Sequence, residues 1–238
     1  MITIRPYKEL GNANYGWLNA HYHFSFARYV DRNYMGFGPL RVINDDIVSA
    51  HNGFDTHPHD NMEIITYVRK GAITHKDSLG NEGKTKAGDV QVMSAGTGIF
   101  HSEYNHEDED TLLYQIWITP KERDIQPRWD TKEFPKEPVT DKLTLLASGH
   151  KEHADQNALF INQDAAIYAG TIPANQNITH KLDSSAYILV SRGQVTINGQ
   201  KAQQGDGVQI TDIENLDITA TEDSELLVIE VNHETAEN

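Results

Sequence analysis

The chain has 238 residues, 38% hydrophobic and 23% charged, so it is long enough for one large or two small globular domains and too apolar for wholesale disorder. Its 20 basic and 35 acidic residues give a formal net charge of −15, which disfavours direct contact with nucleic acid or an anionic lipid surface. The absence of cysteine excludes disulfides, thiolate catalysis and zinc–thiolate sites, so any metal must be held by His, Asp or Glu.

The first residues contain no long apolar run of the kind found in signal peptides. No apolar run reaches the roughly 18–20 residues that span a bilayer, so we expect no membrane association and a cytoplasmic location. Further along, His21 and His23 have His-x-His spacing. No second pair of ligands accompanies them, and we interpret them as surface or packing residues.

Two ligand pairs stand out in the first half of the chain. They are His57 with His59, and His101 with Glu103. Residues i and i+2 of a strand project to the same face, so two such strands facing each other inside a barrel would bring four side chains to one point. Three imidazoles and a carboxylate suit Fe(II), Mn(II), Ni(II), Cu(II) or Zn(II), and they leave two positions of an octahedral ion open.

Strand signals dominate both halves of the chain. Short runs of β-branched, aromatic or alternating residues lie at 90–93, 112–118, 186–190, 194–197 and 226–231. Turn residues separate them, and Asn198-Gly199 between two such runs predicts a hairpin. No long helical period is present. The pattern therefore predicts an all-β protein built as a sandwich or barrel.

A stretch of different composition divides the chain. It carries four prolines, many charges and few apolar residues, which is typical of a connector. We therefore predict an N-terminal metal-binding domain over 1–120, a connector over 121–142 and a C-terminal domain over 143–238.

The two halves contain a faint internal repeat. In each, a strand that ends in Gly is followed by a second strand that opens with Gly-Asp, at Gly88-Asp89 and again at Gly205-Asp206. The second half lacks any His-x-His, and its His180 and His233 are isolated. We predict a duplicated sandwich whose C-terminal copy binds no metal.

Longer motifs place the chain near a known family. Residues 53–71 contain Gly, His-x-His, Glu and Gly in the order of the first cupin motif, and residues 88–103 resemble the second. The spacing before His57 and the serine at Ser94 depart from general cupins. Pirins share both departures, and the amino-acid sequence at 24–29, 35–46 and 93–103 resembles that of pirins.

The resemblance implies an all-β bicupin, that is, two tandem jelly-roll cupin domains, with one divalent metal in the N-terminal barrel. The pirin ligands correspond here to His57, His59, His101 and Glu103, and Fe(II) is the metal we expect, with Mn, Ni, Cu and Zn as alternatives. Glu63 holds the place of the general cupin glutamate ligand, which pirins do not use as a ligand. We interpret Glu63 as a residue that lines the cavity and orients a ligand imidazole or acts as a base.

Two functions follow from the resemblance. Some pirins resemble quercetin 2,3-dioxygenase, an O₂-dependent oxidoreductase. In such an enzyme Glu63 or Glu103 would take the hydroxyl proton of a small, flat aromatic substrate. Phe24, Phe26 and Phe54 are candidate aromatic walls, although packing in the core is the interpretation we favour for them.

Other pirins resemble regulators, in which the metal's redox state alters binding to a protein partner. A C-terminal barrel without a metal motif fits partner docking or dimer formation equally well. The sequence does not choose between enzyme and regulator, among the metals, or among oligomeric states.

Overall fold

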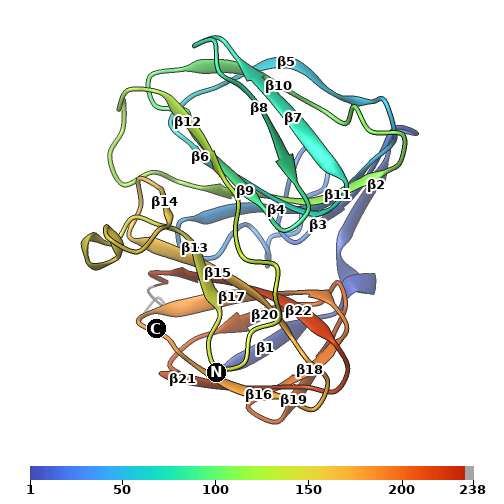
Figure 1. Cartoon of the computed structure of the whole chain (residues 1–238), viewed down its shortest axis with the longest axis vertical. Coiled ribbons are helices and arrows are strands. Elements are labelled where there is room, and N and C mark those ends of the chain that lie inside the picture. Colours follow the sequence, from blue (N-terminus) through green and yellow to red (C-terminus); the bar gives the residue numbers. More distant parts are fainter. Residues whose placement is uncertain (234–238) are drawn as a thin grey trace.

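The computed structural model describes residues 1–233 and consists almost entirely of β-strands (Figure 1). The chain forms two stacked β-sandwiches, each made of a seven-stranded and a four-stranded sheet. Two single-turn 3₁₀ helices complete the elements, η1 (Tyr7–Glu9) and η2 (Lys151–His153). Within residues 1–233, no helix has the length and apolar character needed to cross a membrane. The predicted all-β architecture of two tandem sandwiches is confirmed.

The N-terminal sandwich is built mainly from residues 11–132. Its seven-stranded sheet has the order β12-β9-β6-β11-β4-β3-β2. These strands are β2 (Gly11–Asn14), β3 (Leu18–Tyr22), β4 (Leu40–Val48), β6 (Glu63–Lys70), β9 (Val90–Ser94), β11 (Thr111–Ile118) and β12 (Arg128–Lys132). Its four-stranded sheet has the order β5-β10-β7-β8. These strands are β5 (Gly53–His59), β7 (Ala72–Asp77), β8 (Glu82–Lys86) and β10 (Ile99–Tyr104).

The C-terminal sandwich repeats this plan. Its seven-stranded sheet has the order β1-β20-β17-β22-β15-β13-β14. These strands are β1 (Ile2–Arg5), β13 (Thr144–Ser148), β14 (Leu159–Phe160), β15 (Ala165–Ile172), β17 (Ser185–Arg192), β20 (Gly207–Ile210) and β22 (Ser224–Val231). The four-stranded sheet consists of β16 (Asn177–Lys181), β18 (Gln194–Ile197), β19 (Gln200–Gln203) and β21 (Asn215–Ala220).

The predicted hairpin joins β18 and β19. Asn198 and Gly199 both have positive φ, 47° and 82°, as a two-residue type I′ turn requires. Asn and Gly tolerate this left-handed conformation better than other residues, which is why the dipeptide was informative.

The structure departs from the predicted domain division at two places. Strand β1 pairs with β20 of the C-terminal sheet, and its Ile2 and Ile4 pack against the core of that sandwich. Strand β12, inside the predicted connector, pairs with β9 and packs Trp129 against the N-terminal sandwich. The proline-rich segment therefore links the halves and also completes the first sheet.

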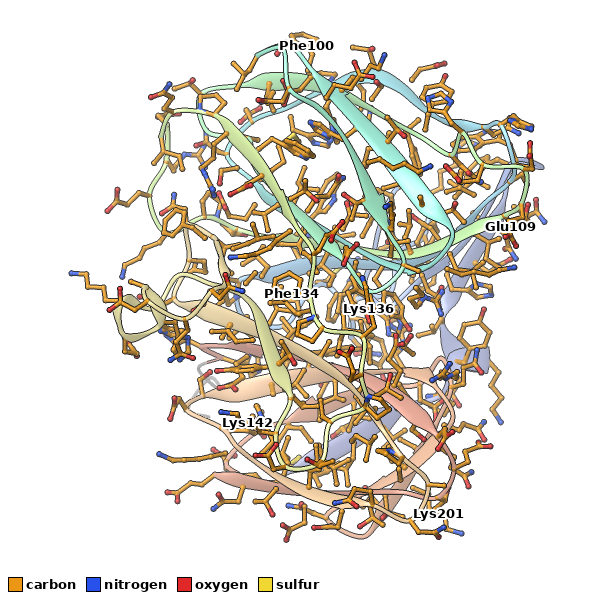
Figure 2. The ribbon with its side chains drawn as sticks, viewed as in Figure 1. Phe100, Glu109, Phe134, Lys136, Lys142 and Lys201 are labelled. Carbon is orange, nitrogen blue, oxygen red and sulfur yellow. The ribbon has the colours of Figure 1, made fainter. Side chains whose placement is uncertain are left out.

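The two seven-stranded sheets face each other, and one large apolar core lies between them. Ile65 and Ile116 from the first sheet share this core with Ile167 and Leu227 from the second. Phe134, on the segment after β12, lies between the sandwiches and is only 6% exposed (Figure 2). The N-terminal seven-stranded sheet is thus covered on both faces, because its other face lines the interior of its own sandwich.

Candidate metal centre

The inner face of the N-terminal seven-stranded sheet carries a row of polar side chains. Asn44, Gln115, Thr66 and Gln91 are cross-strand partners on β4, β11, β6 and β9. Successive side chains of a strand point to opposite faces, so the neighbours Ile43, Ile116 and Ile65 enter the core between the sandwiches instead. A polar row inside a sandwich needs hydrogen-bond partners, and the opposite sheet supplies them for Thr66, Gln91 and Gln115.

The four predicted ligands come from two adjacent strands of that opposite sheet. Strand β5 carries His57 and His59, and β10 carries His101 and Glu103. The strands pair antiparallel with His101 beside His57, and a register shift follows between His101 and Glu103. We expected the two pairs to approach from strands that face each other across the barrel, which is wrong. They meet because their strands are neighbours in one sheet.

The three imidazoles form a compact group. One ring nitrogen from each of His57, His59 and His101 lies within 4.8 Å of the others. The Nε2 atoms of His57 and His101 are 3.1 Å apart. Metal–nitrogen bonds of about 2.0–2.1 Å at a right angle would separate two nitrogens by about 3 Å, so this spacing suits two neighbouring ligands of one ion. The donor set therefore fits a divalent transition metal.

The local environment lowers the pKa of two of these rings, His101 and His59. Burial, followed by the neighbouring His57 and His75, lowers the pKa of His101 to about 3. Burial, followed by His101 and His57, lowers the pKa of His59 to about 4. The Nδ1 of His57 lies 2.7 Å from the carbonyl oxygen of Asp55, which can only accept, so Nδ1 carries a proton and Nε2 is the ring nitrogen that faces the other imidazoles. Neutral imidazoles are the form that binds metals.

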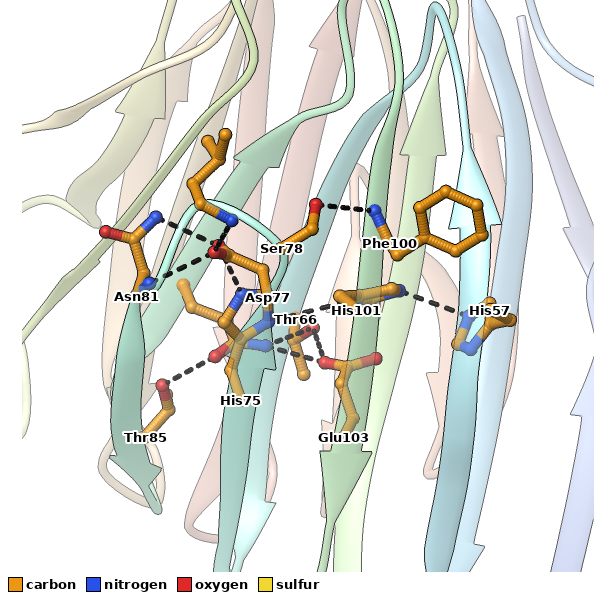
Figure 3. Close-up of polar contacts among 12 residues, drawn as sticks. His57, Thr66, His75, Asp77, Ser78, Asn81, Thr85, Phe100, His101 and Glu103 are labelled. Carbon is orange, nitrogen blue, oxygen red and sulfur yellow. Dashed lines mark hydrogen bonds and ion pairs between the residues drawn. The ribbon is translucent and has the colours of Figure 1, made fainter.

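Glu103 lies beside this group, and its carboxylate is held by the polar row. It accepts a hydrogen bond from Thr66 Oγ1 at 3.0 Å (Figure 3). Two more come from Gln91 Nε2, at 2.6 Å, and from Gln115 Nε2. The residue is 3% exposed. Its position two residues after His101 on β10 is the one the sequence predicts for a ligand, and its role as fourth ligand stays a prediction.

Glu63 lies elsewhere. Its Oε2 accepts hydrogen bonds from Ser94 Oγ at 2.8 Å and from the backbone N–H of Asn162, in the C-terminal half, at 3.0 Å. Burial raises the pKa of this carboxyl. On β6 it is the neighbouring Ile64 that lines the cavity, so alternation directs Glu63 to the interface between the sandwiches. The prediction that Glu63 lines the cavity and orients a ligand imidazole is wrong.

The histidines open onto a cavity of about 520 Å³ with aromatic walls. Phe26 and Phe54 line it together with Trp17, Tyr22 and Trp117, a set that includes two of the three candidate phenylalanines. Phe24 does not line it, because it is fully buried in the core between the sandwiches. A cavity of this size and character suits a small, flat aromatic molecule.

The remaining histidines of interest have ordinary packing roles. His21 is bonded to Tyr7 and Asn12, and His23 is buried against the Tyr187 hydroxyl. Neither belongs to the histidine group, as we interpreted from the sequence. In the C-terminal sandwich, His180 pairs with Glu230 at 3.0 Å.

Sequence reasoning missed one residue pair next to the site, His75 and Asp77 on β7. His75 is fully buried, and its Nδ1 lies 3.4 Å from the Nδ1 of His101. The two have the same i, i+2 spacing as the predicted ligand pairs, which is the signal that would have singled them out.

Comparison with known proteins agrees with this architecture. The pirin family model matches residues 3–118, and a model described as a quercetinase C-terminal cupin domain matches residues 145–231. A pirin-like protein from Caulobacter vibrioides is 50% identical over 232 residues, which cover 97% of this chain and 99% of the relative. The chain belongs to the pirin family. The two sandwiches of this pirin are accordingly cupin domains.

Other relatives have names that state an activity or a bound metal. A protein named quercetin 2,3-dioxygenase from Escherichia coli K12 is 44% identical over 234 residues, covering 97% of this chain and 99% of the relative. The crystal structure of YhhW from Escherichia coli matches with a TM-score of 0.92 and 43% identity, covering all of both chains. A second structure, of bacterial pirin YhhW in complex with nickel(II), has a TM-score of 0.90 and 43% identity, covering 98% of this chain and 100% of that one.

Proposed function

We propose that this pirin is a metal-dependent dioxygenase that acts on a flavonol-like aromatic substrate in the N-terminal cavity. One observation carries the proposal: the group formed by His57, His59 and His101 opens directly onto a cavity walled by aromatic side chains. The name of the Escherichia coli relative, quercetin 2,3-dioxygenase, supports the same substrate class.

In this proposal the three imidazoles and Glu103 hold one divalent ion, which would supply Lewis-acid and redox chemistry to a bound substrate and O₂. Fe(II) is the metal we expect from the family resemblance. Ni(II) is supported by the nickel complex of the pirin relative. Mn(II), Cu(II) and Zn(II) also suit the ligand types.

The protein's own side chains orient the substrate and exclude water. Trp17, Phe54 and Trp117 provide flat apolar surfaces on which a flavonol can stack. Glu103 lines the same cavity next to the imidazoles. We assign it the substrate's hydroxyl proton, because a base must lie within hydrogen-bond reach of the proton it takes. Glu63, at the interface between the sandwiches, does not meet that requirement.

The test is aerobic turnover of quercetin by protein loaded separately with Fe(II), Mn(II), Ni(II) and Cu(II). We expect metal-dependent loss of quercetin coupled to O₂ uptake. His101→Ala should lose both stoichiometric metal and turnover, while His21→Ala, whose ring bonds Tyr7 and Asn12, should keep both. Absence of turnover with all four metals would refute the proposal. If metal binding were retained in that case, the regulatory alternative, acting through a protein partner, would be favoured.

A further inference from the structure

A chain of buried polar groups runs from Asp77 through His75 to His101. Strand β7 pairs with β10, which sets Asp77 beside His101 and His75 beside Glu103. The side chains of His75 and Asp77 are both 0% exposed, and the His75 ring stacks on Trp129 with centroids 4.7 Å apart and planes at 6°. Figure 3 shows His75 between Asp77 and His101. Solvent therefore does not satisfy these groups, and their hydrogens must be assigned from one another.

The Asp77 carboxylate is fixed as an acceptor. Its Oδ1 receives the backbone N–H groups of Leu79 at 2.9 Å and Asn81 at 3.1 Å, and its Oδ2 receives Asn81 Nδ2 at 2.9 Å. Burial alone would raise the pKa of Asp77, but these bonds and the one from His75 lower it overall. An ionised carboxylate can only accept, so His75 Nε2, 3.0 Å from Oδ2, must carry a proton and donate it.

The position of the proton on His75 determines the position of the proton on His101. A neutral His75 that is protonated on Nε2 has a lone pair on Nδ1, which faces His101 Nδ1 at 3.4 Å. That contact is satisfied when His101 carries its proton on Nδ1. The lone pair of His101 is then on Nε2, the atom 3.1 Å from His57 Nε2. In His57, too, Nδ1 is the donor, because it is bonded to the carbonyl oxygen of Asp55.

We propose that Asp77 and His75 are positioning residues that set the tautomer of His101, so that its Nε2 is free to bind a metal. The proposal rests on the proposed role of His101 as a ligand. Outer partners of this kind orient ligand imidazoles and raise their basicity, and losing one weakens metal binding by about 10- to 100-fold.

Asp77→Asn tests this because it reverses the direction of the hydrogen bonds from residue 77 through His75 to His101, while the side chain nearly keeps its shape. The two backbone N–H groups of Leu79 and Asn81 would retain the amide oxygen at the Oδ1 position, which places the NH₂ group at the Oδ2 position against His75 Nε2. The same NH₂ group faces Asn81 Nδ2, so the amide of Asn81 has to turn by half a turn to present its oxygen. His75 would then accept at Nε2 and donate from Nδ1, and His101 would be driven to carry its proton on Nε2. His75→Gln keeps an acceptor and a donor on one planar group, so it should preserve the original polarity.

The first measurement is the histidine ¹⁵N NMR spectrum of the metal-free wild-type protein, in which we expect His101 protonated on Nδ1. The second is Ni(II) affinity by chelator competition. Asp77→Asn should weaken it by about 10- to 100-fold, and His75→Gln by less. The matched control is Glu230→Gln, which alters a His–carboxylate pair of the same length, also buried, in the other sandwich and should leave affinity unchanged.

A wild-type spectrum with His101 protonated on Nε2 would overturn the proposal, as would Asp77→Asn with affinity within twofold of wild type. Equal loss in Asp77→Asn and Glu230→Gln would also overturn it, because that result indicates general destabilisation. If the wild-type protein bound no metal, the proposed function would fail, yet the NMR spectrum would still decide the tautomer of His101. The two failures are therefore distinguishable.

Discussion

Substitutions of Glu103 should separate its contribution to metal affinity from its contribution to the stability of the fold. Three donors converge on it, from Thr66, Gln91 and Gln115. Hydrogen bonds to a charged acceptor contribute about 1.5–3 kcal/mol each, so Glu103→Ala removes about 4.5–9 kcal/mol of hydrogen-bond stabilisation. The side chains can recover part of this, since Gln91 Nε2 also reaches Thr66 Oγ1 at 3.3 Å. We expect a net loss of about 2–4 kcal/mol in the metal-free protein.

Glu103→Gln should behave differently. The amide oxygen can keep both donors that now reach Oε1, and the new NH₂ group would face Gln115. The Oε1 of Gln115 has no partner among the described residues, so a half-turn of its amide supplies the acceptor. Glu103→Gln should therefore lower the free energy of unfolding by only about 1 kcal/mol. Metal affinity should fall by at least about 100-fold, because even outer partners are worth about 10- to 100-fold.

Urea unfolding in the presence of a chelator measures the first quantity, and metal competition measures the second. Wild type, Glu103→Gln and Glu103→Ala are compared side by side. Glu103→Gln with affinity within about threefold of wild type would show that Glu103 is not a ligand. A loss of more than about 3 kcal/mol in that variant would contradict the assignment of donors around the carboxylate.

Three further predictions follow from groups outside the histidine cluster. Glu63→Gln should retain wild-type metal content by elemental analysis, because its carboxyl lies at the interface between the sandwiches; loss of metal would contradict that placement. Burial, followed by Arg5, lowers the pKa of His23 to about 3, so below about pH 6.5 the unfolded chain takes up a proton that the folded protein does not. The free energy of unfolding of the wild type therefore falls on acidification. Between pH 7 and pH 5, His23→Gln should lose about 2 kcal/mol less of this free energy than the wild type, measured by urea unfolding of metal-free protein. Equal losses in the two proteins would refute the reasoning. A Cβ at Gly83 would lie 2.3 Å from Trp129, so Gly83→Ala should displace the indole, shift its fluorescence and cost about 1–3 kcal/mol, whereas an unchanged spectrum would contradict the contact.

The features that the sequence predicted well are those with local causes. Strands β9, β11 and β17 follow from runs of β-branched and aromatic residues, and the turn between β18 and β19 follows from Asn-Gly. The i, i+2 spacing of His57 and His59 likewise describes one strand and needs no knowledge of its partner.

The features that were mispredicted depend on which strands meet. That β5 and β10 are neighbours in one sheet, and that β1 pairs with β20 some two hundred residues away, is decided by topology. The side of the sheet to which Glu63 points could not be predicted from the sequence for another reason. Residues 63–68 lie on a strand buried on both sides, so apolar residues occupy both faces and alternation gives no signal.

The two sandwiches share a plan but differ in what fills them. In the C-terminal sandwich, Ile188, Val208 and Val228 of the seven-stranded sheet belong to one apolar core that extends to the four-stranded sheet. In the N-terminal sandwich the corresponding interior is split into two smaller apolar clusters. Between them lie the polar row and the histidines, which line or adjoin the cavity.

This difference explains why the polar row is present. Buried amides and hydroxyls are tolerated only with partners, and Glu103 supplies the acceptor for three of them. Replacing the row with aliphatic residues like those of the second sandwich would remove that need but leave a buried carboxylate unpaired. A buried charge without partners is far more costly than the polar row itself. The row and Glu103 therefore depend on each other. That dependence links the choice of side chains inside the first sandwich to the ligand set proposed for its metal.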